Sequence, residues 1–281
     1  QLAMLLHLRA PSDARVPMLA AIVEYFGRVS QELARIVAER EVTGPEVFAP
    51  LPATSYRRLL LHPWSRGALF ELFAPLAEAL APLIQPDFTT LALQQLHPQE
   101  APWLFESALR LGILDLAFAS GSALEPPVQW GFAPQPTLAL DTRVLAAFAQ
   151  SGGARRFELS AAIEACRDGK ALQSAFTPDE LEAFLRITVA QLFPDLPYRA
   201  SVAAPQRVDA NQLASRVATQ LPRRRRRELR QLAEAAIGTV WNMSRCCLGL
   251  RWTCNRAALL LTRRFDEAAE ALAKEARTLV P

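Results

Sequence analysis

The sequence predicts a mainly α protein, built of packed helical hairpins with at most one small β element near residues 126–142. Three observations support this prediction. Long segments repeat apolar residues at spacings of three and four, which is the period of one helix face. Alternation of apolar with other residues, the period of a strand, is confined to the stretch before residue 142. The 281 residues are 51% hydrophobic, which is enough for one large domain or two small ones.

The first part of the chain is predicted to form helices separated by breaks rich in proline and glycine. A helix is expected over 16–41, because its apolar residues trace one face: Leu19, Ile22, Val23, Phe26, Val29, Leu33, Ile36 and Val37. It ends at Thr43-Gly44-Pro45, and a proline-spaced linker follows over 48–54. Further helices are expected over 68–83, where Pro86-Asp87 breaks the pattern, and over 99–118, where Ser120-Gly121-Ser122 closes it.

The second part begins with the β element and returns to helices. Two short strands are expected from alternating positions around Pro134 and Pro136: Val128, Trp130 and Phe132, then Thr137, Ala139 and Asp141. A helix is predicted over 157–167. Another begins at Thr177-Pro178, with Thr as N-cap and Pro at the first helical position, and runs to about 193. The last helices are expected over 212–221, 223–247 and 252–279.

These elements predict two layers, a helical one over residues 1–122 and a helical one with the short β element over 123–281. No stretch approaches the roughly 18 uninterrupted apolar residues that a membrane span needs. Gln1, in place of an initiator Met, indicates a processed or truncated start.

Composition argues against several classes of site. The net charge of +3 is too small to indicate a dedicated nucleic-acid binder by itself. The chain lacks the glycine motifs of nucleotide-binding loops, and it has only 11 glycines. None of the histidines, His7, His62 and His97, has a partner at metal-ligand spacing. No metal or cofactor is therefore expected. His62 and His97 each precede a proline at a helix entrance, where an imidazole serves as a cap or is solvated.

The four cysteines are Cys166, Cys246, Cys247 and Cys254, a spacing that fits neither a metal knuckle nor a secreted disulfide framework. They predict free, buried thiols in a reducing compartment, and hence a cytoplasmic protein.

The sharpest local feature is a run of five arginines, followed at a distance of three residues by a sixth. We predict that it forms the first turns of a helix, where cations oppose the macrodipole and attract something anionic. The candidate binding residues are Arg223, Arg224, Arg225, Arg226, Arg227 and Arg230. A solvated basic turn paired with the chain's own carboxylates is the alternative interpretation.

Two segments resemble each other at an offset of 35 residues. Leu61-His62-Pro63 precedes Leu69-Phe70-Glu71, and Leu96-His97-Pro98 precedes Leu104-Phe105-Glu106. This offset is close to the period of helix-pair repeats. Chance similarity in a leucine-rich chain is the alternative.

The last segment resembles the second helix of a tetratricopeptide repeat (TPR), with Phe265-Asp266-Glu267-Ala268 after the small residues Ala257 and Ala258. A TPR-like hairpin would therefore end the second layer. An ordinary helical hairpin is the alternative.

Together with 56–63 (YRRLLLHP), 69–73 (LFELF) and 253–261 (TCNRAALLL), this segment resembles the C-terminal region of large bacterial TPR proteins of unassigned function. In that family a strand followed by a helix is similar to zinc peptidases whose helix carries H-E-x-x-H. The resemblance places the ligand and base positions at Ala165, Cys166 and Gly169, none of which supplies that chemistry. It therefore implies a scaffold without peptidase activity.

The sequence predicts a non-catalytic structural or adaptor protein that binds other protein subunits within a larger assembly. The alternative is a subunit that contacts nucleic acid or another anionic surface through Arg223–Arg227. A third possibility is a divergent zinc-peptidase-like protein, for which Glu164 and Asp168 would be the residues to test.

Overall fold

The computed structural model describes residues 56, 60–84, 88, 91–132, 135–151, 153–167, 170, 172, 176–198, 210–237, 239–262, 268–269 and 271–272. The predicted helix over 16–41 and the linker over 48–54 lie outside these residues, as does most of the predicted TPR-like segment after Phe265. Within them the protein is mostly helical, with a small four-stranded mixed sheet. The predicted fold class is correct in its helical content, but it understates the sheet.

The sheet has the strand order β1-β2-β4-β3. Its strands are β1 (Gln94–Gln95), β2 (Ala117–Gly121), β3 (Val128–Phe132) and β4 (Pro136–Asp141). The predicted hairpin is confirmed as the antiparallel pair β3 and β4, in which Trp130 faces Leu138. β4 also pairs with β2 in parallel, and β1 pairs with β2 antiparallel.

The strand β2 was predicted as the end of a helix over 99–118, and this prediction is wrong. The helix α6 (Pro102–Leu111) stops at Gly112, which adopts the left-handed conformation with a φ of 75°. Its last carbonyls are capped by main-chain bonds, from Gly112 N to Leu109 O and from Ile113 N to Ala108 O, both 2.9 Å long. The chain then enters β2, in which the four residues from Phe118 to Gly121 are buried.

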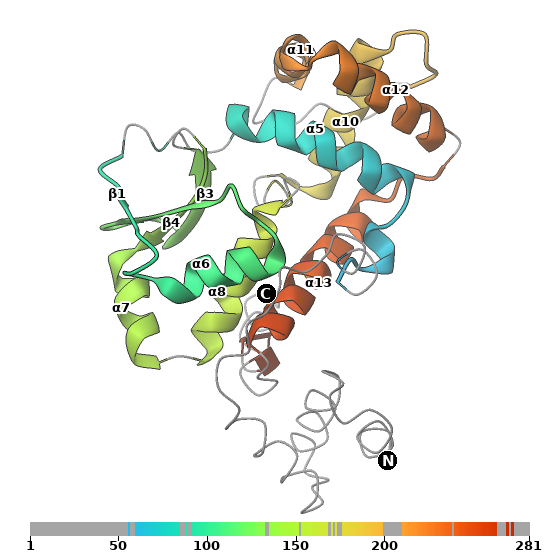
Figure 1. The fold of residues 1–281 in the computed structure, drawn as a ribbon. Coiled ribbons are helices and arrows are strands. Elements are labelled where there is room, and N and C mark those ends of the chain that lie inside the picture. The colour runs from blue at the N-terminus through green and yellow to red at the C-terminus, as the bar shows by residue number, and fades with distance from the viewer. Residues whose placement is uncertain are drawn as a thin grey trace, which may run out of the picture.

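The helices form two groups joined by one long helix (Figure 1). α5 (Ala68–Ile84), α10 (Pro178–Leu192), α11 (Ala210–Gln220) and α12 (Arg223–Ala236) gather at the end of the molecule away from the sheet. α7 (Thr142–Ser151) and α8 (Gly153–Ala165) accompany α6 beside the sheet. The predicted start of α10 is confirmed, because Thr177 and Glu180 form a complete capping box.

The helix α13 (Met243–Thr262) corrects two predicted boundaries. The sequence predicted one helix over 223–247, but α12 ends at Ala236, and Asn242 Oδ1 accepts a 2.8 Å hydrogen bond from Arg245 N where α13 starts. The predicted break between 247 and 252 is absent, because α13 continues through Gly249.

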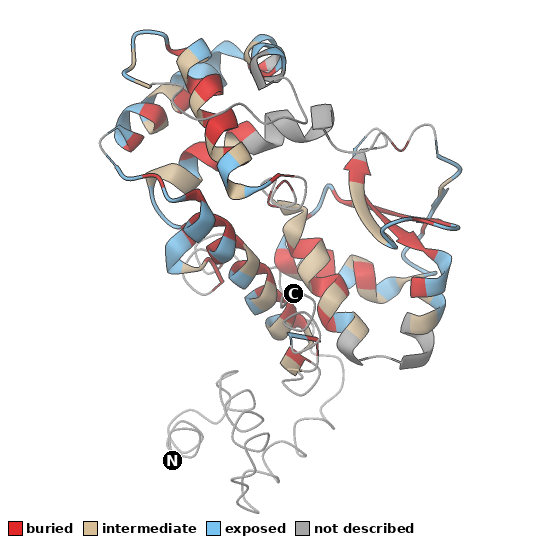
Figure 2. Ribbon diagram, turned by 180° about the vertical axis from the view of Figure 1, so that it is seen from behind, coloured by how far each residue is buried: buried red, intermediate tan, exposed pale blue. Residues whose placement is uncertain are grey.

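Buried residues form two main cores, and α13 contributes to both (Figure 2). Cys246 and Leu250 pack with α5, α10, α11 and α12, whereas Ala257 and Leu261 pack with the sheet, α6 and α8. The sheet crosses the predicted boundary at residue 122, since β2 precedes this residue and its paired neighbour β4 follows it. None of the described helices is long and apolar enough to cross a bilayer.

Candidate functional site

The arginine run lies where the sequence predicted it, on the first turns of α12. The helix begins at Arg223 after Pro222, and no side chain caps its N-terminus. All five side chains from Arg223 to Arg227 are exposed. The run is therefore a cationic surface at the end of a helix that carries a partial positive charge.

Part of this surface is occupied by contacts within the chain. Arg226 turns back to the C-terminal end of α11, where it donates to the carbonyl oxygens of Leu221, at 3.0 Å, and Ala218. These contacts place its charge at the negative end of the α11 dipole. Arg226 thus links the start of α12 to the end of α11.

Neighbouring carboxylates pair with three other arginines of the cluster. Arg224 and Arg225 lie 3.2 and 3.6 Å from the carboxylate oxygens of Glu228. Arg230 lies 2.5 Å from Asp195 and 2.9 Å from Glu234, and its hydrogen bonds lower the pKa of Asp195. The predicted pairing of the run with the chain's own carboxylates is therefore found at Arg224, Arg225 and Arg230.

Arg223 and Arg227 form no ion pair with any residue that the structure describes. The side chain of Arg224 remains 92% exposed despite its ion pair.

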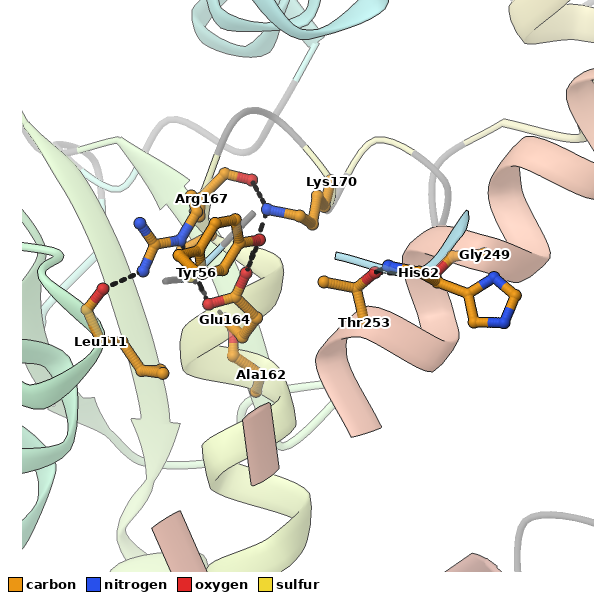
Figure 3. A network of polar contacts seen from close by, with 10 residues as sticks. Tyr56, His62, Leu111, Ala162, Glu164, Arg167, Lys170, Gly249 and Thr253 are labelled. Atoms are coloured by element: carbon orange, nitrogen blue, oxygen red, sulfur yellow. Dashed lines mark hydrogen bonds and ion pairs between the residues drawn. The ribbon is translucent and has the colours of Figure 1, made fainter. Parts of the chain in front are cut away.

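A second cluster gathers around Glu164, in the last turn of α8 (Figure 3). Its carboxylate is fully buried and accepts a 2.5 Å hydrogen bond from the Tyr56 hydroxyl. Lys170 Nζ lies 3.1 Å and Arg167 Nε 3.2 Å from its oxygens. One buried carboxylate thus joins a phenol and two cations, which compensates the cost of removing its charge from water.

The remaining donors of this cluster bind main-chain oxygens. Lys170 Nζ donates to the carbonyl of Arg167 at 3.2 Å, and Arg167 donates to the carbonyl of Leu111. The Arg167 guanidinium also stacks over the Tyr56 ring, 4.3 Å from its centroid. Burial raises the pKa of Tyr56 well above its ordinary value. The cluster therefore links residue 56 and the end of α6 to the end of α8.

The positions that the family resemblance assigned to zinc chemistry lie at this end of α8. Cys166 Sγ contacts the carbonyl of Ala162 at 3.2 Å, and burial raises the pKa of its thiol. Gly169 and Asp168 lie outside the described residues. Among the described residues, no three His, Cys, Asp or Glu side chains are placed to hold one metal ion.

A third group, which sequence reasoning missed, lies on the surface of α13. The 3-10 helix η1 (Pro63–Ser65) packs against this helix and carries Trp64 to within 4.9 Å of Trp252, measured between ring centroids. The His62 ring contacts both indoles edge-on, at 5.4 and 4.5 Å. Arg245 lies over Trp64, 4.3 Å from its centroid. We call His62, Trp64, Arg245, Leu248 and Trp252 the α13 surface.

The apolar members of the α13 surface reach solvent, since Trp64, Leu248 and Trp252 are 36, 38 and 37% exposed. His62 Nδ1 accepts a hydrogen bond from Trp64 N, which confirms its predicted capping role. The His97 side chain is exposed, in agreement with the predicted solvated alternative, and its main-chain N–H donates to Glu100.

Close packing holds η1 on α13. A Cβ atom at Gly249 would lie 2.4 Å from Ser65 Oγ, so only glycine permits this approach. His62 N donates to Thr253 Oγ1 at 3.0 Å, and Ser65 Oγ donates to the carbonyl of Cys246 at 3.4 Å. His62, Gly249 and Thr253 are seen together in Figure 3. These contacts hold the segment that carries His62 and Trp64 against α13.

One signal in the sequence could have indicated this surface. No Asp or Glu occurs between Glu234 and Asp266, although this segment contains five arginines. Within it Arg245, Leu248 and Trp252 recur at helical spacing. The contribution of His62 and Trp64 could not be predicted, because they lie nearly 200 residues away in the chain.

No protein-family model, curated protein or solved structure matches this chain.

Proposed function

We propose that this chain is a non-catalytic adaptor that binds another protein through the α13 surface. The observation that supports the proposal is the exposed pair of indoles, Trp64 and Trp252, beside Arg245. Tryptophan and arginine are the residue types that most often dominate the binding energy of protein interfaces. Because η1 is clamped on α13, little side-chain entropy is lost when a partner binds.

The buried Glu164 cluster fits a supporting role in this proposal. Its carboxylate is in contact with three donors and closed off from solvent, so it acts as a link between segments. The free thiols of the described cysteines are consistent with a reducing compartment, and we propose a cytoplasmic location on that basis.

The test is affinity purification of the full chain from its source cells, with and without nuclease, followed by mass spectrometry. The wild type is compared with Trp64→Ser/Trp252→Ser, and with Trp252→Ser alone as a milder change. Leu114→Ser, at an exposed leucine outside the α13 surface, is the matched control. We expect stoichiometric protein partners that survive nuclease and that both tryptophan variants lose. Partners retained by both variants would contradict the proposal.

The second candidate function is contact with an anionic polymer through Arg223, Arg224 and Arg227. It is supported by the exposure of these side chains at a helix N-terminus. Replacing all three with Gln should weaken binding of a DNA duplex and reduce the slope of log K against log salt by about one per arginine. A variant that replaces Arg110, Arg155 and Arg156 with Gln removes the same charge elsewhere. Equal slopes for the two variants would exclude this site.

A further inference from the structure

The exposed face of α13 carries positive charge and apolar groups in one row. Arg245, Leu248, Trp252, Arg256 and Leu260 are all exposed and follow one another at spacings of three or four residues. The row covers about 22 Å of helix. Arg256 forms no ion pair with any described residue.

Charges of one sign surround the aromatic group within this row. Burial and the guanidinium groups of Arg256, Arg66 and Arg245 lower the pKa of His62. No acidic side chain offsets them along the helix, because the sequence has no Asp or Glu between Glu234 and Asp266. A carboxylate approaching this face therefore meets attraction from several arginines at once.

The arrangement of the indoles disfavours a nucleic acid as the partner. Arg245 and Trp252 are seven residues apart, about 10.5 Å along the helix axis. Trp64 contacts both: the Arg245 guanidinium lies over its ring, 4.3 Å from the centroid, and the Trp252 ring centroid lies 4.9 Å from that of Trp64. A nucleobase stacks on a free ring face. The Arg245 guanidinium already lies over the Trp64 ring, which disfavours stacking of a base there.

We propose that the α13 surface, extended by Arg256, binds an acidic amphipathic segment of a protein partner. Its carboxylates would pair with Arg245 and Arg256, and its apolar side chains would cover Leu248 and Trp252. This inference rests on the proposed adaptor function and specifies the chemistry of the partner.

The probe is a fluorescein-labelled amphipathic peptide of roughly 18 residues, long enough to cover the row, with Leu along one helical face and Glu along both flanks. Versions with Gln or Lys in place of Glu and a single-stranded oligothymidine are the comparison probes. Binding to the full chain is measured by fluorescence anisotropy. We expect the Glu peptide to bind about tenfold more tightly than the Gln peptide, with an affinity that falls as salt increases.

Charge reversal tests the residues. Arg245→Glu/Arg256→Glu should weaken binding of the Glu peptide at least about tenfold and gain binding of the Lys peptide. The matched control is Arg156→Glu/Arg216→Glu, which reverses two exposed arginines outside the row and should bind as the wild type does. Arg245→Gln/Arg256→Gln, with folding checked by circular dichroism, should also weaken binding of the Glu peptide, but by a smaller factor.

The outcomes separate this inference from the adaptor function. Equal binding of the Glu and Gln peptides, or equal losses in the test and control variants, would overturn the acidic partner. Preferential binding of oligothymidine, lost in Trp252→Ser, would replace it with a nucleic acid. The adaptor function is decided separately, by whether the nuclease-resistant partners depend on Trp64 and Trp252.

Discussion

At the scale of single residues, the buried polar groups have specific and checkable partners. Glu164 and Asp141 are both fully buried, and each carboxylate is surrounded by donors. A buried charge is tolerated only where such donors replace water. Removing either charge should therefore have a larger effect than removing a carboxylate on the surface.

Glu164→Gln should lower the free energy of unfolding by about 3–5 kcal/mol, because Lys170 then loses its buried counter-ion. The measurement is urea unfolding followed by circular dichroism. The matched control is Glu158→Gln on the same helix, whose partly exposed ion pair with Arg155 should contribute about 1 kcal/mol or less. Similar small changes for both variants would show that Glu164 is not compensated as described.

Asp141 predicts a dependence of stability on pH. Its carboxylate accepts hydrogen bonds from Arg143 N at 2.8 Å and Leu124 N at 2.9 Å, and pairs with the Arg143 guanidinium. These bonds hold the pKa of Asp141 below its ordinary value, with those from Arg143 dominant. A carboxyl with a lowered folded-state pKa stabilises the fold above its unfolded pKa of about 4, and this contribution is lost as the pH falls.

The variant Asp141→Asn should accordingly be less stable than the wild type at pH 7. The difference should shrink as the pH is lowered below about 4, because the carboxyl of the unfolded wild type then binds a proton while that of the folded protein stays charged to a lower pH. Urea unfolding of both proteins, from pH 7 down through pH 4, measures this difference in unfolding free energy. A difference that stays constant with pH would show that the charge of Asp141 does not contribute.

At the scale of elements, helix propensity and tertiary packing oppose each other at Gly249, where η1 contacts α13. Glycine weakens a helix interior relative to alanine by about 1 kcal/mol. At Gly249, however, a methyl group would meet Ser65 Oγ at 2.4 Å and Ser65 N at 3.0 Å. The tertiary contact therefore decides which residue suits this position.

Gly249→Ala should lower the stability of the protein by about 1–3 kcal/mol, the range for overpacking a close contact, although alanine is the better helix former. It should also weaken binding at the α13 surface, because η1 carries Trp64. Thermal unfolding and the anisotropy assay measure the two effects. Ser244→Ala, at an exposed position of the same helix, is the control. An increase in the melting temperature of Gly249→Ala would contradict the described packing.

At the scale of the whole molecule, α13 is the element that the two cores share. One end packs among α5, α10, α11 and α12, and the other packs against α8 and the sheet side of the molecule (Figure 1). Its buried cysteines therefore report on the integrity of the packing along its length. Burial raises the pKa of Cys246 to about 12 and that of Cys247 to about 11.

A thiol reagent should accordingly label the native protein slowly and the unfolded protein fast, because the thiolate is the reactive form. The rate of labelling at pH 7, followed residue by residue with mass spectrometry, measures this. Unfolding in urea provides the reference for full reactivity. Rapid labelling of Cys246 or Cys247 in the native protein would contradict their burial.

The sequence by itself determined the features that depend on neighbouring residues. The capping box at Thr177, the helix that begins at Arg223 and the hairpin of β3 and β4 all follow from caps, breakers and periodicity within a few positions. The same local signals did not reveal β2. The helical pattern predicted from residue 99 runs on to residue 118 unless Gly112 is recognised as the end of the helix.

Only the tertiary structure decided which distant residues share a site. Tyr56 meets Glu164 across 108 positions of sequence, and His62 meets Thr253 across 191. Neither pairing leaves a periodic trace, because each depends on how helices pack after they have formed. The arginine run could be located from the sequence, whereas its division into paired and exposed members required α11, Asp195 and Glu228 to be placed around it. Local hydrogen bonding and periodicity thus determine the elements, and long-range packing determines the surfaces they build.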